Sequence, residues 1–294
     1  MYKFNDLLDV LYQQTQKKFI DPVVDDVQYD PSMILTFSNN TCKVLHESKN
    51  NDKFRTKLIV HVLNLLKTDC KDILFFLDDY TKHIPDTNVR SACFAKKKAQ
   101  SFITIPNAHW LMGFLDKVFS DVINYDIQFS EKIEKTIFAG GPNCEYGETR
   151  CRYVFSSLNN KKHDIFLCNN DAYRLPIEIQ LQYKYLINID GHGLCYDRLY
   201  WQMLSNSVPI YLEKKSDIFQ IPDCFIEENI NYIASSVENI DETLDYLNNT
   251  KSGKDHCLEI INNNKNFINE FFTQNPQQRS FEIMKFIFDS LKSN

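Results

Sequence analysis

Hydrophobic residues follow two different spacings along the chain, and segments of the two kinds alternate from one end to the other. Apolar residues three and four positions apart predict amphipathic helices. Short continuous runs of apolar, β-prone residues predict buried strands. The predicted helices are 4–18, 54–67, 111–124, 129–135, 199–204, 240–247, 256–272 and 278–291. The predicted strands, of which the first two form an expected hairpin, are 33–37, 41–45, 73–77, 92–95, 136–141, 164–168, 185–189, 208–212 and 230–234.

Strands that alternate with helices predict an α/β fold with parallel sheets. The chain has 294 residues, which fits one large domain or two of ordinary size. We place a boundary where the predicted linking helix gives way to a strand and a glycine pair. The expected domains are therefore residues 1–135 and 136–276. Pro276 separates the last two predicted helices, which lets the final helix change direction.

The stretch 182–213 has the pattern of a complete β-loop-α-β unit. Its loop contains Gly191 and Gly193, and Arg198 opens the helix that follows. In open α/β sheets, ligands sit beyond the carboxyl ends of the strands. Amides at a helix start and a guanidinium together suit a phosphate or diphosphate. The same features also fit a plain structural loop, because loops with two glycines are common and an arginine at a helix start is usually solvated.

An acidic pair and an aromatic turn are further candidates for chemistry. Asp78 and Asp79 follow the apolar run 73–77, where an α/β protein often keeps its catalytic groups. A helix cap or a solvated turn is the alternative interpretation of this pair. His109 and Trp110 follow a proline turn, where they either line a cleft or pack under the turn.

The composition narrows the class of protein. The formal net charge of −6 argues against nucleic acid as the main partner. We expect no transmembrane segment, because no run of about 18 apolar residues is present. The first residues lack the basic and then apolar plan of a signal peptide, so we expect a cytoplasmic protein. Its nine cysteines, which show no CxxC zinc spacing, are then expected to be free thiols.

Several segments, taken in order, resemble the signature of glycosyltransferase family 90. That family includes capsule-associated transferases, Rumi-like protein O-glucosyltransferases, and short bacterial and viral relatives. The matching segments are Leu77-Asp78-Asp79-Tyr80, Ile105-Pro106 with Trp110, Phe138-Ala139-Gly140-Gly141 with Arg150, and Lys184-Tyr185-Leu186 with Gly191, Arg198 and Asn206-Ser207. Their order and spacing agree with the family from about Ile73 to Ala234, which is most of the chain.

The chain departs from the family pattern at three positions. Ala139 stands where an arginine is usual, and Tyr196 stands where a serine is typical. Asp190 occupies a position at which some relatives carry an arginine. The departures at Ala139 and Tyr196 affect places that would contact the donor phosphate or sugar.

The resemblance implies a GT-B architecture, with two Rossmann-like domains and the active site in the cleft between them. Residues 1–135 would bind the acceptor, and residues 136–276 would bind the nucleotide sugar. In such proteins the last helix commonly crosses back onto the first domain, so we expect helix 277–294 to pack there.

The resemblance also implies an inverting reaction that requires no cofactor or metal. Asp79 would act as the general base on an acceptor hydroxyl, and Arg198 and Arg150 would stabilise the leaving diphosphate. The donor would be UDP-xylose or UDP-glucose, and the acceptor a glycan or glycoconjugate. The other residues expected to bind the donor are Gly140, Gly141, Asp190, Gly191, Tyr196 and Ser207. The acceptor-cleft candidates are Asp78, Tyr80, His109 and Trp110.

Two rival hypotheses remain open at this point. In the first, Asp78 and Asp79 hold a divalent ion on the diphosphate, as in a metal-dependent GT-A transferase. In the second, the chain binds a nucleotide or glycan without catalysis, and Ala139 and Tyr196 are the residues that would signal this loss.

Overall fold

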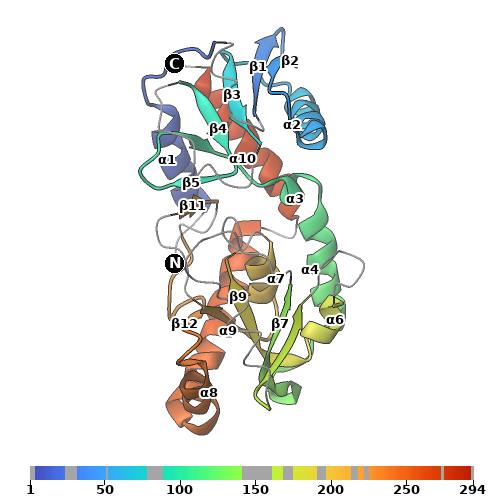
Figure 1. The fold of residues 1–294 in the computed structure, drawn as a ribbon, viewed down its shortest axis with the longest axis vertical. Coiled ribbons are helices and arrows are strands. Elements are labelled where there is room, and N and C mark those ends of the chain that lie inside the picture. The colour runs from blue at the N-terminus through green and yellow to red at the C-terminus, as the bar shows by residue number, and fades with distance from the viewer. Residues whose placement is uncertain are drawn as a thin grey trace. The chain divides into compact units, whose positions relative to one another are not determined.

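The computed structural model contains two five-stranded sheets with surrounding helices, so the chain is a mixed α/β protein (Figure 1). The structure describes residues 4–23, 32–50, 52–77, 89–140, 161–167, 175–190, 197–212, 218–221, 225–272 and 275–292. The chain divides into two compact units. Unit 1 comprises Met1–Phe114, Asp217–Cys224 and Phe272–Asn294, and unit 2 comprises Leu115–Ser216 and Phe225–Phe271. Within the described ranges, no helix is long and apolar enough to cross a membrane.

The sheet of unit 1 is mixed. Its strands are β1 (Ser32–Ser38), β2 (Thr41–Glu47), β3 (Ile73–Phe76), β4 (Ser91–Cys93) and β6 (Ile103–Thr104), in the order β2-β1-β3-β4-β6. β1 is antiparallel to both neighbours, whereas β3, β4 and β6 run parallel. The predicted hairpin is confirmed, and its turn residues Asn39 and Asn40 have φ angles of 51° and 57°. Two successive positive φ angles match the tight turn that the twist of a hairpin favours.

The helices of unit 1 gather around the last helix of the chain. They are α1 (Phe4–Thr15), α2 (Lys53–Leu66), α3 (Ala108–Leu111) and α10 (Pro276–Leu291), and α10 contacts each of the other three. Asn275 caps α10, because its side chain accepts a hydrogen bond from the Gln278 amide at 2.8 Å. Pro276 occupies the first turn, where its missing N–H costs no helix hydrogen bond. A short ribbon of β5 (Ala95–Lys97) and β11 (Ile218–Gln220) completes the unit.

The sheet of unit 2 is parallel throughout. Its strands are β7 (Ile133–Gly140), β8 (His163–Leu167), β9 (Tyr183–Ile189), β10 (Val208–Leu212) and β12 (Ile233–Ser235), in the order β12-β10-β9-β7-β8. If these strands are renumbered 1 to 5 in chain order, their order across the sheet is 5-4-3-1-2. Read from the other edge, the order is 2-1-3-4-5, which is that of a doubly wound sheet. The winding reverses between β7 and β9. This pair is therefore the topological switch point, at which such sheets bind ligands.

Helices cover both faces of this sheet. The helical segments that lie wholly or mostly in unit 2 are α4 (Phe114–Tyr125), a 3-10 turn at Phe129–Glu131, α6 (Ile177–Gln180), α7 (Arg198–Leu204), α8 (Ile240–Asn249) and α9 (Lys251–Phe272). Tyr185, Ile187 and Ile189 of β9 pack in one core with residues of α8 and α9. Because side chains alternate along a strand, Asn188 points to the other face, where it meets α7.

Two predicted helices differ from the observed ones for local reasons. The segment 129–135 was expected to be helical, but β7 begins at Ile133, whose amide bonds to the Gln182 carbonyl at 2.7 Å. The helix expected over 111–124 is interrupted at Gly113, which has a φ of 74°. The units also divide at Phe114, within α4 and before the predicted boundary at residue 135. The division into acceptor and donor domains stays a prediction.

A buried histidine links two strands of unit 2 to α8. His163 is fully buried, with Nδ1 at 2.8 Å from Thr136 Oγ1 and Nε2 at 2.9 Å from Asp241 Oδ1. Burial, the largest effect, lowers the pKa of His163 below its ordinary 6.5, although the hydrogen bond to Asp241 opposes it. Protonation of this ring therefore favours the unfolded chain.

We expect the stability of unit 2 to fall as the pH drops from about 6.5 through the lowered pKa of His163. His163→Gln should flatten this dependence between about pH 7.5 and about pH 5.5. The free energy of unfolding is measured with urea and followed by Trp201 fluorescence. In a Trp110→Phe background Trp201 is the one remaining tryptophan, so the signal reports on unit 2. His61→Gln replaces an exposed histidine of α2 in unit 1 and serves as the control substitution. If the stability of His163→Gln fell as steeply with falling pH as that of the parent, the expectation would be contradicted.

Candidate functional site

The Arg198 guanidinium lies across the carboxyl end of β7. Arg198 opens α7, and its Nη2 donates a hydrogen bond to the Ala139 carbonyl at 2.6 Å. Its guanidinium carbon is 5.0 Å from the centre of the Phe138 ring, within the range of a cation–π contact. Phe138 belongs to the core that faces α8 and α9. The side chain thus reaches from the start of α7 to the end of β7, beside the switch point.

Gly140 is required by this close approach. A Cβ atom there would lie 2.7 Å from Arg198 Nη2 and 3.1 Å from Phe138 Cζ. Both separations are below ordinary van der Waals contact, so a side chain at Gly140 would push the guanidinium away. The predicted residues Gly140 and Arg198 are therefore in contact.

Asp190 lies at the same edge of the sheet, directly after β9. Its carboxylate is buried and accepts a hydrogen bond from the Tyr211 hydroxyl. The Tyr211 ring is itself buried, at 5.3 Å from the ring of Tyr232. The sequence did not single out Tyr211, because a tyrosine inside the apolar run 208–212 is indistinguishable from a core residue. The carboxyl edge thus holds a half-buried cation at β7 and a buried, hydrogen-bonded carboxyl group at β9.

Ser207 lies at the opposite end of the sheet. It precedes β10, whose first residue Val208 pairs with Tyr185 near the start of β9. The five residues of β10 separate it from the carboxyl edge by about 16 Å. Its Oγ donates to the Tyr183 carbonyl at 2.8 Å, so Ser207 fixes β10 to β9. The structure does not bring it together with Arg198.

The residue before it has a similar structural role. The Asn206 amide donates to Asp126 Oδ2 at 2.6 Å, and its side chain donates to the Ile127 carbonyl at 3.0 Å. Lys265 of α9 donates to Asn206 Oδ1. The pair Asn206-Ser207, which contributes to the family resemblance, is therefore used here to join elements at the amino end of the sheet.

The two acceptor-cleft candidates of α3 lie in unit 1. Trp110 is fully buried, with its ring 5.1 Å from that of Phe272, so it packs under the turn. Asn107 caps the helix by accepting a hydrogen bond from the Trp110 amide at 3.1 Å. His109 is half-buried beside Phe114, at 5.4 Å between ring centres. Of the two, only His109 has an exposed surface of appreciable size.

The remaining site candidates lie outside the described residues. They are Asp78, Asp79, Tyr80, Gly141, Arg150, Gly191 and Tyr196. Their roles stay predictions. In the part of the chain that the structure covers, no group of three or more His, Cys, Asp or Glu residues could hold a metal ion. The cysteines described there, Cys42, Cys70, Cys93 and Cys257, are free thiols.

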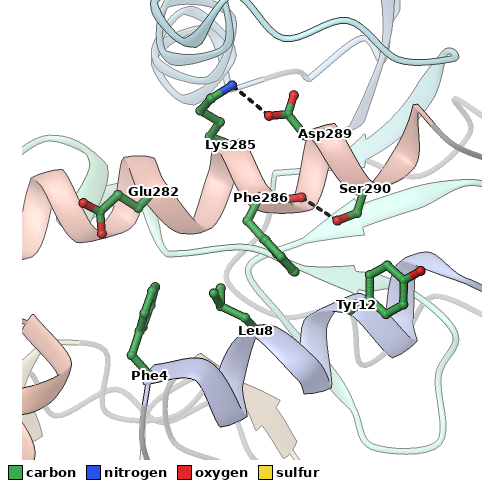
Figure 2. A pocket seen from close by; sticks show the side chains of 8 residues that line it. All are labelled: Phe4, Leu8, Tyr12, Glu282, Lys285, Phe286, Asp289 and Ser290. Carbon is green, nitrogen blue, oxygen red and sulfur yellow. Dashed lines mark hydrogen bonds and ion pairs between the residues drawn. The ribbon is translucent and has the colours of Figure 1, made fainter.

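A groove of about 610 Å³ lies between α1 and α10 of unit 1 (Figure 2). Its lining consists of Phe4, Leu8, Tyr12, Glu282, Lys285, Phe286, Asp289 and Ser290. Two of its polar groups bond within α10, since Lys285 donates to Asp289 at 2.7 Å and Ser290 to the Phe286 carbonyl at 2.7 Å. None of the site candidates that the structure describes is among these lining residues.

The sequence matches no protein-family model and no curated protein. The family resemblance therefore stands on its motifs alone.

Gly140→Ala tests whether this glycine makes room for the guanidinium. We expect the variant to fold, because the Arg198 atom that must move is the end of a flexible side chain. Arg198 should then react several times faster with phenylglyoxal, measured by mass spectrometry of its peptide. Ala139→Gly changes the neighbouring side chain without adding atoms, and should leave the rate at the parental value. A parental rate in Gly140→Ala would show that the glycine does not position the arginine.

Proposed function

We propose that the chain is a glycosyltransferase that uses a nucleotide sugar, whose diphosphate binds to the sheet of unit 2. The observation that carries this proposal is the position of the Arg198 guanidinium, at the carboxyl edge and at the switch point between β7 and β9. Open α/β sheets bind ligands at this place. A guanidinium carries several N–H donors in a planar fork, so a bond to the Ala139 carbonyl is compatible with contacts to phosphate oxygens.

The guanidinium supports the proposal better than the helix start does. α7 has only seven residues, so its dipole makes a small contribution. The Arg198 side chain is half-buried over Phe138, and a charge in such a place interacts more strongly than one in water. Gly140 keeps the space that this arrangement needs.

The reaction class comes from the family resemblance. Asp79 would take the proton of an acceptor hydroxyl, which attacks the anomeric carbon and breaks its bond to the diphosphate with inversion. Arg198 and Arg150 would stabilise the charge that develops on the leaving group. We also propose a GT-B arrangement, UDP-xylose or UDP-glucose as the donor, a glycan as the acceptor, and a reaction that requires no metal.

Arg198→Ala should weaken binding of uridine diphosphate by about 10- to 100-fold, as expected for the loss of a charge-assisted hydrogen bond. Arg198→Lys keeps the positive charge but loses the planar set of N–H donors. Its affinity for uridine diphosphate should therefore lie between those of the parent and Arg198→Ala. Isothermal titration calorimetry measures the three dissociation constants. Arg279 pairs with Glu282 on α10 of unit 1, and Arg279→Ala is the matched control that should bind as the parent does. An unchanged dissociation constant in Arg198→Ala would remove Arg198 from the site.

Donor hydrolysis tests the reaction itself. Without acceptor, the purified protein should release uridine diphosphate slowly from one nucleotide sugar of a panel, whether or not a chelator is present. Asp79→Asn should reduce this release by about 10²- to 10⁴-fold while binding of uridine diphosphate persists. Loss of activity with chelator would instead favour the metal-dependent transferase. Tight nucleotide binding without turnover, including in an acceptor screen, would favour the non-catalytic protein.

A further inference from the structure

α7 is enclosed on almost every side. Leu199, Tyr200, Trp201 and Met203 are all buried, none being more than 5% exposed. A helix that is apolar all round has no polar face that fixes its rotation about its own axis. Apolar packing of this kind tolerates alternative arrangements of similar volume. A directional polar contact would select one of these arrangements and so fix which side of α7 faces β9.

Gln202 and Asn188 supply such a contact. Asn188 Nδ2 donates a hydrogen bond to Gln202 Oε1, and neither residue is more than 1% exposed. Asn188 Oδ1 has no hydrogen-bond partner in the described structure. Burial of polar groups costs free energy unless each is hydrogen-bonded, so maximum stability does not explain this pair. Buried polar pairs of this type are best known for fixing the register of packed helices.

The pair is placed so that it also determines the position of Arg198. Arg198 and Gln202 are four residues apart on α7 and share one face of it. Arg198 is then about 6 Å nearer the helix start than Gln202. Along β9, Asp190 is about 7 Å nearer the carboxyl edge than Asn188. A bond between Gln202 and Asn188 therefore holds Arg198 level with the carboxyl edge of the sheet.

We propose that Asn188 and Gln202 are positioning residues that fix the rotation of α7 and so hold Arg198 at the switch point. Their effect on ligand binding rests on the proposed function, whereas their effect on Arg198 does not. The two consequences can be measured separately.

A double-mutant cycle with isosteric apolar residues tests the pair. Asn188→Leu and Gln202→Met should each lower the melting temperature, because each leaves a buried polar group without its partner. In the double variant both polar groups of the pair are replaced, so no member of the pair is left without its partner. Its melting temperature should therefore return to about the parental value or exceed it. Its Arg198 should nevertheless react several times faster with phenylglyoxal, with Arg279 as the internal reference. Its affinity for uridine diphosphate should fall about tenfold, since one charge-assisted contact is misplaced.

A control separates positioning from general destabilisation. Trp201→Phe removes apolar contacts from the same helix and leaves the polar pair intact, so it should lower the melting temperature without changing the reactivity of Arg198. Gln202→Met alone should lower the melting temperature and raise the reactivity of Arg198. This single variant keeps the test usable if the double variant does not fold.

The outcomes are distinguishable. Parental reactivity of Arg198 in both Gln202→Met and the double variant would overturn the positioning role. Equal reactivity of Arg198 in Trp201→Phe and Gln202→Met would also overturn it. Increased reactivity of Arg198, in a protein whose parent binds no uridine diphosphate, would support the positioning role and reject the proposed function.

Discussion

The parallel pairing of β7 with β9 is the constraint on which unit 2 depends. It brings together two strands separated by β8 in the chain, and it sets the order β12-β10-β9-β7-β8. Parallel pairing also places the carboxyl ends of both strands at one edge. Arg198, which follows β9, can therefore reach the Ala139 carbonyl at the end of β7. Without this pairing, no local sequence feature would place an arginine, a glycine and a buried aspartate at a common edge.

Buried polar groups occur at both ends of the sheet of unit 2. At the amino end, the buried Lys132 bonds to Asp126 at 2.5 Å and to the Leu181 carbonyl, and Asn206 is held by several partners. These bonds join elements and satisfy each other, as buried charges require. Toward the carboxyl end, the Asn188 amide is bonded on one side only. A buried group that is incompletely hydrogen-bonded calls for an explanation, and a functional site nearby is one of the explanations.

The sequence predicts the strands of the fold better than it predicts the contacts of the candidate site, and the reasons are physical. The strand 208–212 matches β10 in full, and the runs 73–77 and 185–189 match β3 and β9 closely, because continuous apolar segments are buried in any sheet. Strand order was not readable, since it depends on contacts between residues far apart in the chain. Gly140 and Arg198 were singled out separately, but their contact follows from that order. Asn188 and Gln202 carried no signal, because a single amide in an apolar segment has no periodicity.

The residues that produce the family resemblance do not all have the same meaning. Asn206 and Ser207 bond to backbone at the amino end of the sheet, so any protein with this sheet could use them. Arg198 and Gly140 lie at the carboxyl edge, where the fold itself does not require a cation. Under the proposed function, the second pair would lie at the ligand, whereas the first pair would have a structural role. Under the proposed function, Asp79 would supply the general base that a transferase needs in addition to its nucleotide-sugar site, while Ala139 and Tyr196 are the residues that would signal a non-catalytic protein.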